Sequence, residues 1–184
     1  MKEKQRLFNK FQSLQKSKND LLRAISDLSE EQLNTTAVED KWSIAQVLYH
    51  VCLAEKLTLE YMKKKTTDLS QVEKSGLREA LKSTLLKLSL KLPIKYRAPK
   101  SIADSLPEEI EWNEFLLKWG DTRDEIYKFI EWLPKEAVDK NIFKHPRTGM
   151  MNITQTLRFI KDHFDHHVPQ IKTQLELIRN NINS

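Results

Sequence analysis

Cysteine, glycine and proline are scarce in this chain, whose 184 residues include one cysteine, three glycines and six prolines. Turns between β-strands draw heavily on glycine and proline, so their scarcity argues against a many-stranded architecture and for long helices. The single cysteine, Cys52, cannot form an internal disulfide, which favours an intracellular protein. We therefore expect a helix-rich protein of the cytoplasm.

Long apolar runs and a strong excess of one charge are also missing. No segment reaches the roughly 20 consecutive apolar residues that a membrane helix requires, and the polar first residues are unlike a secretory signal. The 31 basic and 26 acidic side chains give a net charge of only +5. The most basic stretch, from Lys82 to Lys100, is interpreted as a solvated surface, because charge alone gives only non-specific attraction to nucleic acids. We expect neither a membrane nor a nucleic acid as a partner.

Apolar residues recur at steps of three and four in four segments, as they do along one face of an α-helix. The first predicted helix covers about residues 3–30, and the second about residues 44–64. The third starts near Ser105 and Pro107 and ends before Pro134, and the fourth follows Asn152. The four tryptophans are interpreted mainly as core side chains.

The connection between the second and third helices is long. Within it, residues 78–90 are predicted to form a shorter helix. Residues 92–100 are predicted to cross the bundle in an extended conformation, because each proline disfavours helix at the residue before it. These features predict an all-α fold, a four-helix bundle with a long crossover between helices 2 and 3. The length suits a single domain over residues 1–184.

Two of the predicted helices have capping signatures at their starts. Ser43 is followed three residues later by Gln46, and Asn152 is followed three residues later by Gln155. A short polar side chain at the cap and a glutamine three residues on can exchange hydrogen bonds with each other's backbone. We therefore expect the second and fourth helices to begin directly after Ser43 and Asn152.

The last predicted helix carries two histidines at a spacing of four, His163 and His167. Residues four apart lie on the same side of a helix, with Cβ atoms about 5–6 Å apart. His167 falls within the apolar stripe, between Phe164 and Ile171, where a buried side chain is expected. Burying both rings without a shared partner would leave polar nitrogens unsatisfied, so the pair indicates a metal site.

A third histidine, His50, lies at the edge of the apolar face of the second helix. If the second and fourth helices pack with a suitable offset, His50 meets the pair; the alternative is a hydrogen-bonded core histidine without a metal. Three neutral imidazoles suit zinc, nickel, copper or ferrous iron and leave positions for water or substrate. We interpret His145 as a turn residue, His166 as an exposed side chain and Cys52 as a buried structural thiol.

Three motifs resemble those of the DinB-like superfamily, a group of four-helix bundles that includes YfiT-type metal-dependent hydrolases. The motifs are Trp42–Val51 in the second helix, His145–Gly149 before the last helix, and His163–Ile171 in the last helix. The resemblance implies that His50, His163 and His167 form a metal triad, with zinc or nickel as the divalent ion. It also implies a homodimer. Pro169 departs from the usual last helix of the group.

Relatives of this fold include low-molecular-weight-thiol S-transferases and a thiol-dependent isomerase. The resemblance thus implies a metal-dependent enzyme, a hydrolase or a thiol S-transferase, that activates water or a thiol against a small-molecule substrate. The alternative is a non-catalytic dimeric module for binding or stress response, whose metal is structural or absent. The sequence assigns no general base; Asp162, Asp165 and Glu55 are the carboxylates near the histidines in sequence.

Overall fold

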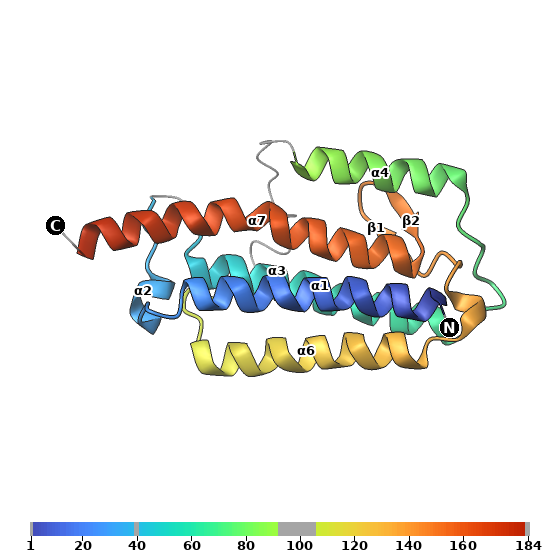
Figure 1. Cartoon of the computed structure of the whole chain (residues 1–184), viewed down its shortest axis with the longest axis horizontal. Helices are drawn as coiled ribbons and strands as arrows, with labels where there is room; N and C mark the ends of the chain where they lie inside the picture. Colours follow the sequence, from blue (N-terminus) through green and yellow to red (C-terminus); the bar gives the residue numbers. More distant parts are fainter. Residues whose placement is uncertain (1, 39–40, 92–105, 183–184) are drawn as a thin grey trace.

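The computed structural model describes residues 2–38, 41–91 and 106–182 of the chain. Four long helices run along its length (Figure 1): α1 (Lys2–Ala24), α3 (Ile44–Thr66), α6 (Trp112–Trp132) and α7 (Ile153–Ile182). The shorter elements are α2 (Glu30–Asn34), α4 (Leu77–Lys91), the 3₁₀ turn η1 (Lys135–Ala137), and the strands β1 (Phe143–His145) and β2 (Gly149–Met151). The predicted all-α four-helix bundle is confirmed, and α4 lies within the predicted crossover between α3 and α6.

The helix α3 packs against both α6 and α7, which makes α3 and α7 direct neighbours. The helix α4 lies outside the bundle along α7 (Figure 1). Buried apolar side chains form two clusters, one of which includes Val47, Leu48, Trp119 and Phe164. This cluster contains side chains from the beginning of α3, from α6 and from the middle of α7.

Both predicted capping signatures are confirmed. The Ser43 hydroxyl accepts a hydrogen bond from the Gln46 amide at 3.1 Å, and the Gln46 side-chain oxygen accepts one from the Ser43 amide at 3.0 Å. Asn152 and Gln155 exchange equivalent bonds of 3.0 and 2.9 Å before α7. These bonds satisfy amides that have no partner within the helix. The two helices that carry the candidate histidines therefore have fixed starting points.

Replacing Ser43 by alanine should destabilise the protein by about 1 kcal/mol, because one amide of the first turn of α3 loses its acceptor. Ser43 is fully buried, so water cannot readily take over this bond. The difference in the free energy of unfolding, measured by urea denaturation, tests this expectation. The control is Ser43→Thr, which keeps the hydroxyl acceptor without adding a charge at a buried position. Equal stability of the alanine variant and the unchanged protein would contradict the capping role.

The first helix was predicted to reach residue 30, but α1 ends at Ala24 and α2 begins at Glu30. The apolar spacing continues past this end, since Ile25 is buried. A third capping box, in which Ser29 and Gln32 exchange side-chain and backbone hydrogen bonds, starts a separate helix at Glu30. A local cap therefore overrides the apolar pattern that suggested one continuous helix.

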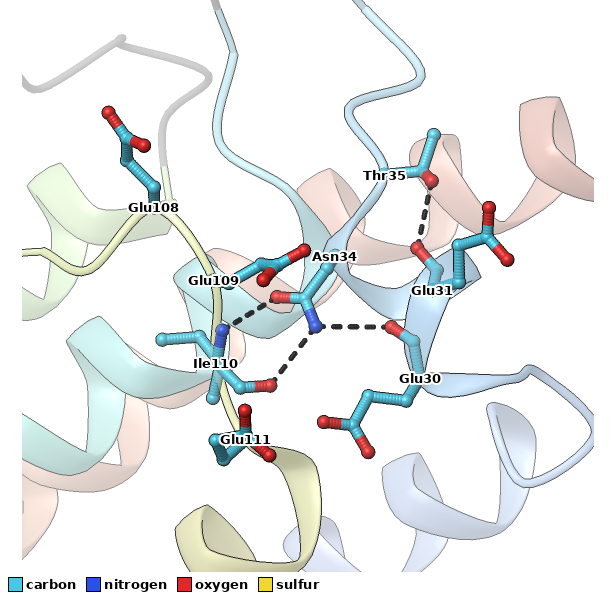
Figure 2. A pocket seen from close by; sticks show the side chains of 8 residues that line it. All are labelled: Glu30, Glu31, Asn34, Thr35, Glu108, Glu109, Ile110 and Glu111. Carbon is cyan, nitrogen blue, oxygen red and sulfur yellow. Dashed lines mark hydrogen bonds between the residues drawn. The ribbon is translucent and has the colours of Figure 1, made fainter.

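The third helix was predicted to start near Ser105 and Pro107, but α6 starts at Trp112. Hydrogen bonds from distant residues hold the preceding segment outside the helix. The Asn34 side chain accepts a bond from the Ile110 amide at 2.9 Å and donates one to the Ile110 carbonyl at 3.0 Å (Figure 2). The Gln46 side chain donates to the Pro107 carbonyl at 3.0 Å. The proline is thus part of a loop, and Ser105 lies outside the described residues.

Three further differences concern single segments. Residues 143–151 form an antiparallel hairpin, where only a turn was expected, and Gly149 takes the positive φ of 84° that its tight turn requires.

Trp132 was expected in the core, but it is 80% exposed. It lies 13 residues after the fully buried Trp119, which turns it by about 220° around α6. The predicted extended crossing at residues 92–100 lies outside the described residues.

Candidate metal centre

The structure brings together the three histidines that the sequence singled out. His50 comes from α3, and His163 and His167 come from successive turns of α7. One nitrogen of each ring lies within 4.8 Å of the nitrogens offered by the other two. The ring centroid of His50 is 5.2 Å from that of His163 and 5.1 Å from that of His167, and the latter two are 4.9 Å apart. The three side chains therefore surround one point between the helices.

The residues present fit a divalent ion. Nitrogens bound to tetrahedral zinc at about 2.0–2.1 Å are roughly 3.4 Å apart, so small ring rotations would bring these nitrogens into coordination. His50 is only 6% exposed, and within the described part of the chain its buried Nδ1 has no hydrogen-bond partner. A buried polar atom without a partner is costly. A cation shared by the three rings would satisfy it.

The surroundings keep the three imidazoles neutral, as metal ligation requires. Burial lowers the pKa of His50 to about 4. Burial, followed by the charge of His50, lowers the pKa of His167 to about 4, against a small opposing effect of its hydrogen bond to Gln170. Burial and the neighbouring His167 and His50 place the pKa of His163 well below its usual range. At neutral pH each ring therefore has one unprotonated nitrogen whose lone pair can bind a metal.

Stability of the metal-free protein should fall as the pH drops from 6.5 to 5. The pKa of His50 and His167 is about 4 in the folded chain and returns to about 6.5 on unfolding, so unfolding takes up protons in this window. From about pH 7.5 upward the two states bind nearly equal numbers of protons at these sites, and stability levels off. Thermal unfolding at pH 7.5, 6.5, 5.8 and 5.0 tests this. A level transition temperature throughout would contradict it.

Each histidine has a different neighbour that restricts its ring. The His167 Nδ1 lies 3.2 Å from the Gln170 side-chain oxygen, which accepts a bond when that nitrogen carries the proton. The Trp42 ring lies 5.2 Å from the His50 ring. The Phe159 ring lies 5.6 Å from the His163 ring. The sequence did not indicate Trp42, Phe159 or Gln170 as parts of this centre, although Gln170 stands three residues after His167.

Trp42 is itself held in place from α7. The Gln174 side-chain amide donates to the Trp42 carbonyl, and its oxygen accepts a bond from the Ala37 amide at 3.4 Å. Gln174 is only 2% exposed. It lies seven residues after His167, two turns along the same helix face. The helix that provides two histidines thus also positions the tryptophan beside the third.

The other two histidines lie near the centre but outside the group of three. The His166 ring is 5.4 Å from the His167 ring, and His166 is half-buried instead of exposed. His145, expected in a turn, ends β1 and is 9% exposed. Burial and the nearby Arg147 lower its pKa to about 4. The His145 side chain is therefore buried beside the turn that follows β1.

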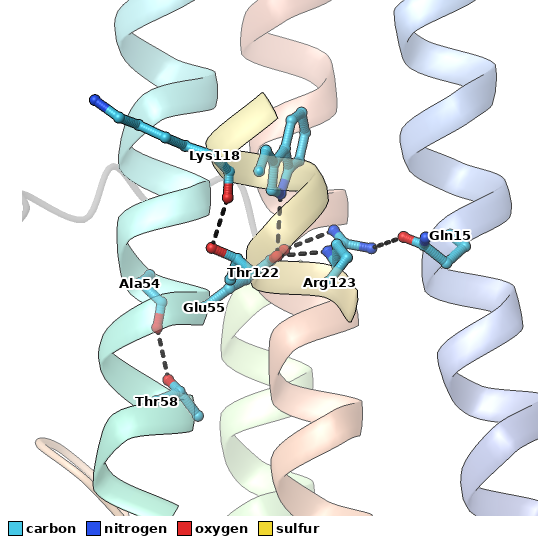
Figure 3. Close-up of polar contacts among 8 residues, drawn as sticks. Gln15, Ala54, Glu55, Thr58, Lys118, Thr122 and Arg123 are labelled. Carbon is cyan, nitrogen blue, oxygen red and sulfur yellow. Dashed lines mark hydrogen bonds and ion pairs between the residues drawn. The ribbon is translucent and has the colours of Figure 1, made fainter. Parts of the chain in front are cut away.

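Two other side chains considered from the sequence, Cys52 and Glu55, are buried and lie outside the group of three histidines. Cys52 is buried, and burial, followed by the charge of Glu55, raises the pKa of its thiol to about 11. The Glu55 carboxylate is fully engaged, accepting bonds from Arg123 Nε at 2.6 Å, Arg123 Nη2 at 2.7 Å and the Trp119 indole at 3.1 Å (Figure 3). These contacts exclude Glu55 as the general base.

This ion pair is a feature that the sequence patterns did not predict. Arg123 is fully buried and also donates to the Gln15 side-chain oxygen at 2.9 Å. Lys18, also buried, places its ammonium 4.8 Å from the centre of the Trp119 ring. The available signal was the position of the two cations, since Lys18 and Arg123 interrupt apolar stripes in their helices. Charged side chains in a stripe indicate a buried partner.

A cavity of about 770 Å³ lies at the end of the bundle near α2 (Figure 2). The side chains of Asn34, Thr35 and Ile110 line it, together with five glutamates: Glu30, Glu31, Glu108, Glu109 and Glu111. Neither His50 nor the pair on α7 borders this cavity. The acidic cavity and the histidine cluster are therefore separate features of the molecule.

Among the described residues, no helix is both long and apolar enough to cross a membrane. Comparison with curated proteins gives no match, and comparison with solved structures gives none either. The model of the DinB superfamily, which has metal-binding members, matches residues 13–171 and so includes α3, the hairpin and all three histidines. This match covers most of the chain and agrees with the helical bundle and the three-histidine cluster, so the chain belongs to the DinB superfamily.

Proposed function

We propose that this protein is a metal-dependent enzyme in which His50, His163 and His167 hold one divalent ion, zinc or nickel. The observation that carries the proposal is that three imidazoles from two helices each place one nitrogen within 4.8 Å of the nitrogens of the other two. A chance meeting of core histidines would be costly, because each ring has nitrogens that need partners. The buried Nδ1 of His50, which has no partner within the described residues, supports the same conclusion.

The number of ligands supports a reactive site over a closed structural one. Within the described part of the chain, the group has three members, and neither Cys52 nor a carboxylate joins it. Structural zinc sites have four protein ligands, whereas catalytic sites have three and leave a position for water or substrate. A three-histidine centre is therefore suited to bind a molecule from solution.

The protein side chains prepare this centre in three ways. Burial keeps the rings unprotonated, Gln170 restrains His167, and the Trp42 and Phe159 rings pack beside His50 and His163. When bound, the metal supplies Lewis acidity that lowers the pKa of a bound water or thiol. We infer a small-molecule substrate attacked by water or by a low-molecular-weight thiol, which corresponds to a hydrolase or a thiol S-transferase.

Two further parts of the proposal concern the protein as a whole. We propose a homodimer, on the basis of the resemblance to dimeric relatives, and multi-angle light scattering on the purified chain measures its mass directly. We also propose that the protein is cytoplasmic. The support is that Cys52 is its single cysteine, so the chain can form no internal disulfide. A mass of one chain across the micromolar range would refute the dimer.

Metal analysis of protein purified without a polyhistidine tag tests the proposed function. The metal-free protein should take up about one equivalent of Zn²⁺ or Ni²⁺ per chain. Loading with Co²⁺ and adding cysteine or another small thiol should then change the visible absorption spectrum, because the thiol enters an open coordination position. Imidazole at the same concentration serves as a control for a non-thiol ligand.

The outcomes separate the proposal from its alternative. A protein that takes up no stoichiometric metal is not a metalloenzyme. A protein that binds metal, but whose Co²⁺ spectrum no added ligand alters, has a closed structural site, and removal of the metal then changes its stability alone. Spectral change with thiols, followed by turnover of an electrophilic test substrate, would support the S-transferase form over the hydrolase form.

A further inference from the structure

We propose that His145 is a positioning residue of the metal centre and that it acts on His163 through the ring of Phe159. This inference rests on the proposed function, because it concerns how the same three histidines are held. It assigns a role to the hairpin β1–β2, which contributes no member to the three-histidine group. The proposal follows from a continuous series of ring contacts that leads from the hairpin to the centre.

The hairpin fixes the His145 ring by its own backbone. His145 Nδ1 accepts hydrogen bonds from the amides of Arg147 at 3.2 Å and Thr148 at 3.3 Å. Two donors converging on Nδ1 require that nitrogen to be unprotonated, so the neutral ring carries its proton on Nε2. Gly149, at a φ of 84°, completes the turn that aims both amides at the ring. The orientation of His145 is therefore set by the turn.

Phe159 connects this ring to the centre. Its ring centroid lies 4.6 Å from that of His145, at an interplanar angle of 71°, an edge-to-face contact. It also lies 5.9 Å from Phe143, with nearly parallel planes at 16°. On the side of the centre it lies 5.6 Å from His163. The hairpin thus holds Phe159 from two directions, and Phe159 packs against the ring of a proposed ligand.

A ligand imidazole must point its lone pair at the metal, so the restraint on its ring affects affinity. Groups that orient metal ligands without touching the metal typically contribute about 10–100-fold to affinity. Gln170 orients His167 through a hydrogen bond to its Nδ1, and the Trp42 ring packs beside the His50 ring. His145 and Phe159 provide the corresponding support for His163. Each of the three rings then has its own neighbour that limits its rotation.

Two substitutions at His145 separate its two contacts. His145→Asn keeps an acceptor near the position of Nδ1 for the turn amides but removes the ring that touches Phe159. His145→Phe keeps the ring but removes the acceptor. The proposal predicts that the asparagine variant weakens Co²⁺ binding by about 10-fold, whereas the phenylalanine variant stays within roughly threefold of the unchanged protein. If only the turn mattered, the order would be reversed.

Phe159→Leu gives the same test from the other end of the contact and remains useful if a His145 variant does not fold. It should also weaken Co²⁺ binding by about 10-fold, and the double variant with His145→Asn should lose little more, because both act through one path. Tyr61→Leu is the matched control. The Tyr61 ring lies 5.7 Å from Phe143, so its loss disturbs the same hairpin while the contacts of His145 and Phe143 with Phe159 stay in place.

The readouts are the dissociation constant of Co²⁺ from the metal-free protein and the visible spectrum of the Co²⁺ form, with circular dichroism confirming the fold. A changed spectrum in the asparagine and Phe159 variants, but not in Tyr61→Leu, supports positioning over general loosening of the hairpin. Equal affinity and spectrum in all variants would overturn the inference while leaving the metal centre intact. Absence of Co²⁺ binding by the unchanged protein would instead refute the proposed function itself.

Discussion

Alanine in place of His167 should lower the affinity for zinc or nickel by more than about 100-fold, since loss of a ligand costs more than loss of a group that merely orients one. The His167 ring lies about 5 Å from both partners of the cluster, at 5.1 and 4.9 Å between centroids. Its removal leaves two imidazoles and an added coordination position for water. Isothermal titration of the metal-free variant with Ni²⁺ or Zn²⁺ measures the loss, and the proposed activity should vanish with it.

The neighbouring histidine provides a matched control. His166 has the same chemistry and lies one residue away, with its ring 5.4 Å from that of His167, but it is outside the group of three. His166→Ala should retain one metal equivalent per chain and an affinity within about tenfold of the unchanged protein. Equal losses in the two variants would contradict the assignment of His167 as a ligand. His50→Ala and His163→Ala should behave like His167→Ala.

Glutamine in place of Glu55 should destabilise the protein by about 3–5 kcal/mol, the usual cost of leaving one member of a buried ion pair without its partner. The side chains of Arg123 and Glu55 are 0% and 2% exposed, so water cannot solvate the guanidinium that remains. Glutamine has nearly the same shape, which limits the effect of lost packing. Urea denaturation of the metal-free protein measures the change in the free energy of unfolding.

Two comparisons separate charge from packing. Asp20→Asn removes a carboxylate whose pairs with Lys16 and Arg23 are exposed, and it should leave the unfolding midpoint almost unchanged. The double variant Glu55→Met, Arg123→Leu removes both charges and should regain most of the stability that Glu55→Gln loses. If Glu55→Gln were no more destabilising than Asp20→Asn, the ion pair would not contribute as described.

The ion pair has a consequence for the metal centre as well. Glu55 lies five residues after His50 on α3, and Arg123 fixes that part of α3 against α6. The Trp119 indole bonds to the same carboxylate, and its ring lies 6.3 Å from Phe164, the residue after His163. The polar network of Gln15, Glu55, Trp119 and Arg123 therefore joins α1, α3 and α6, and the ring contact between Trp119 and Phe164 continues to α7. Such a network specifies one arrangement of neighbouring helices when all its members are satisfied.

The helical class and the helix starts of α3 and α7 were predictable because their causes are local. The apolar spacing depends on residues three or four apart, and each capping box joins residues three apart. Helical periodicity alone likewise places His163 and His167 on one side of α7. It cannot place His50 beside them, because that requires the relative offset of α3 and α7.

The boundaries predicted wrongly show where local patterns fail. The start of α6 depends on Asn34, which bonds to Ile110 across 76 positions of the chain. The burial of Arg123 depends on Glu55, 68 positions away. Neither partner can be inferred from spacing in a single sequence, because many polar residues are available to pair. The apolar stripes marked Arg123 and Lys18 as exceptions without indicating what surrounds them.

The amino-acid order alone determined the long helices, two of their starts, and a pair of imidazoles on one face of the last helix. Periodicity and caps act within one or two turns of backbone, so these features need no knowledge of the rest of the chain. Tertiary packing alone decided that a third imidazole from α3 meets the pair, and that Trp42, Phe159 and the hairpin surround them. Those meetings depend on how distant helices dock, which is set by the summed contacts of the whole core.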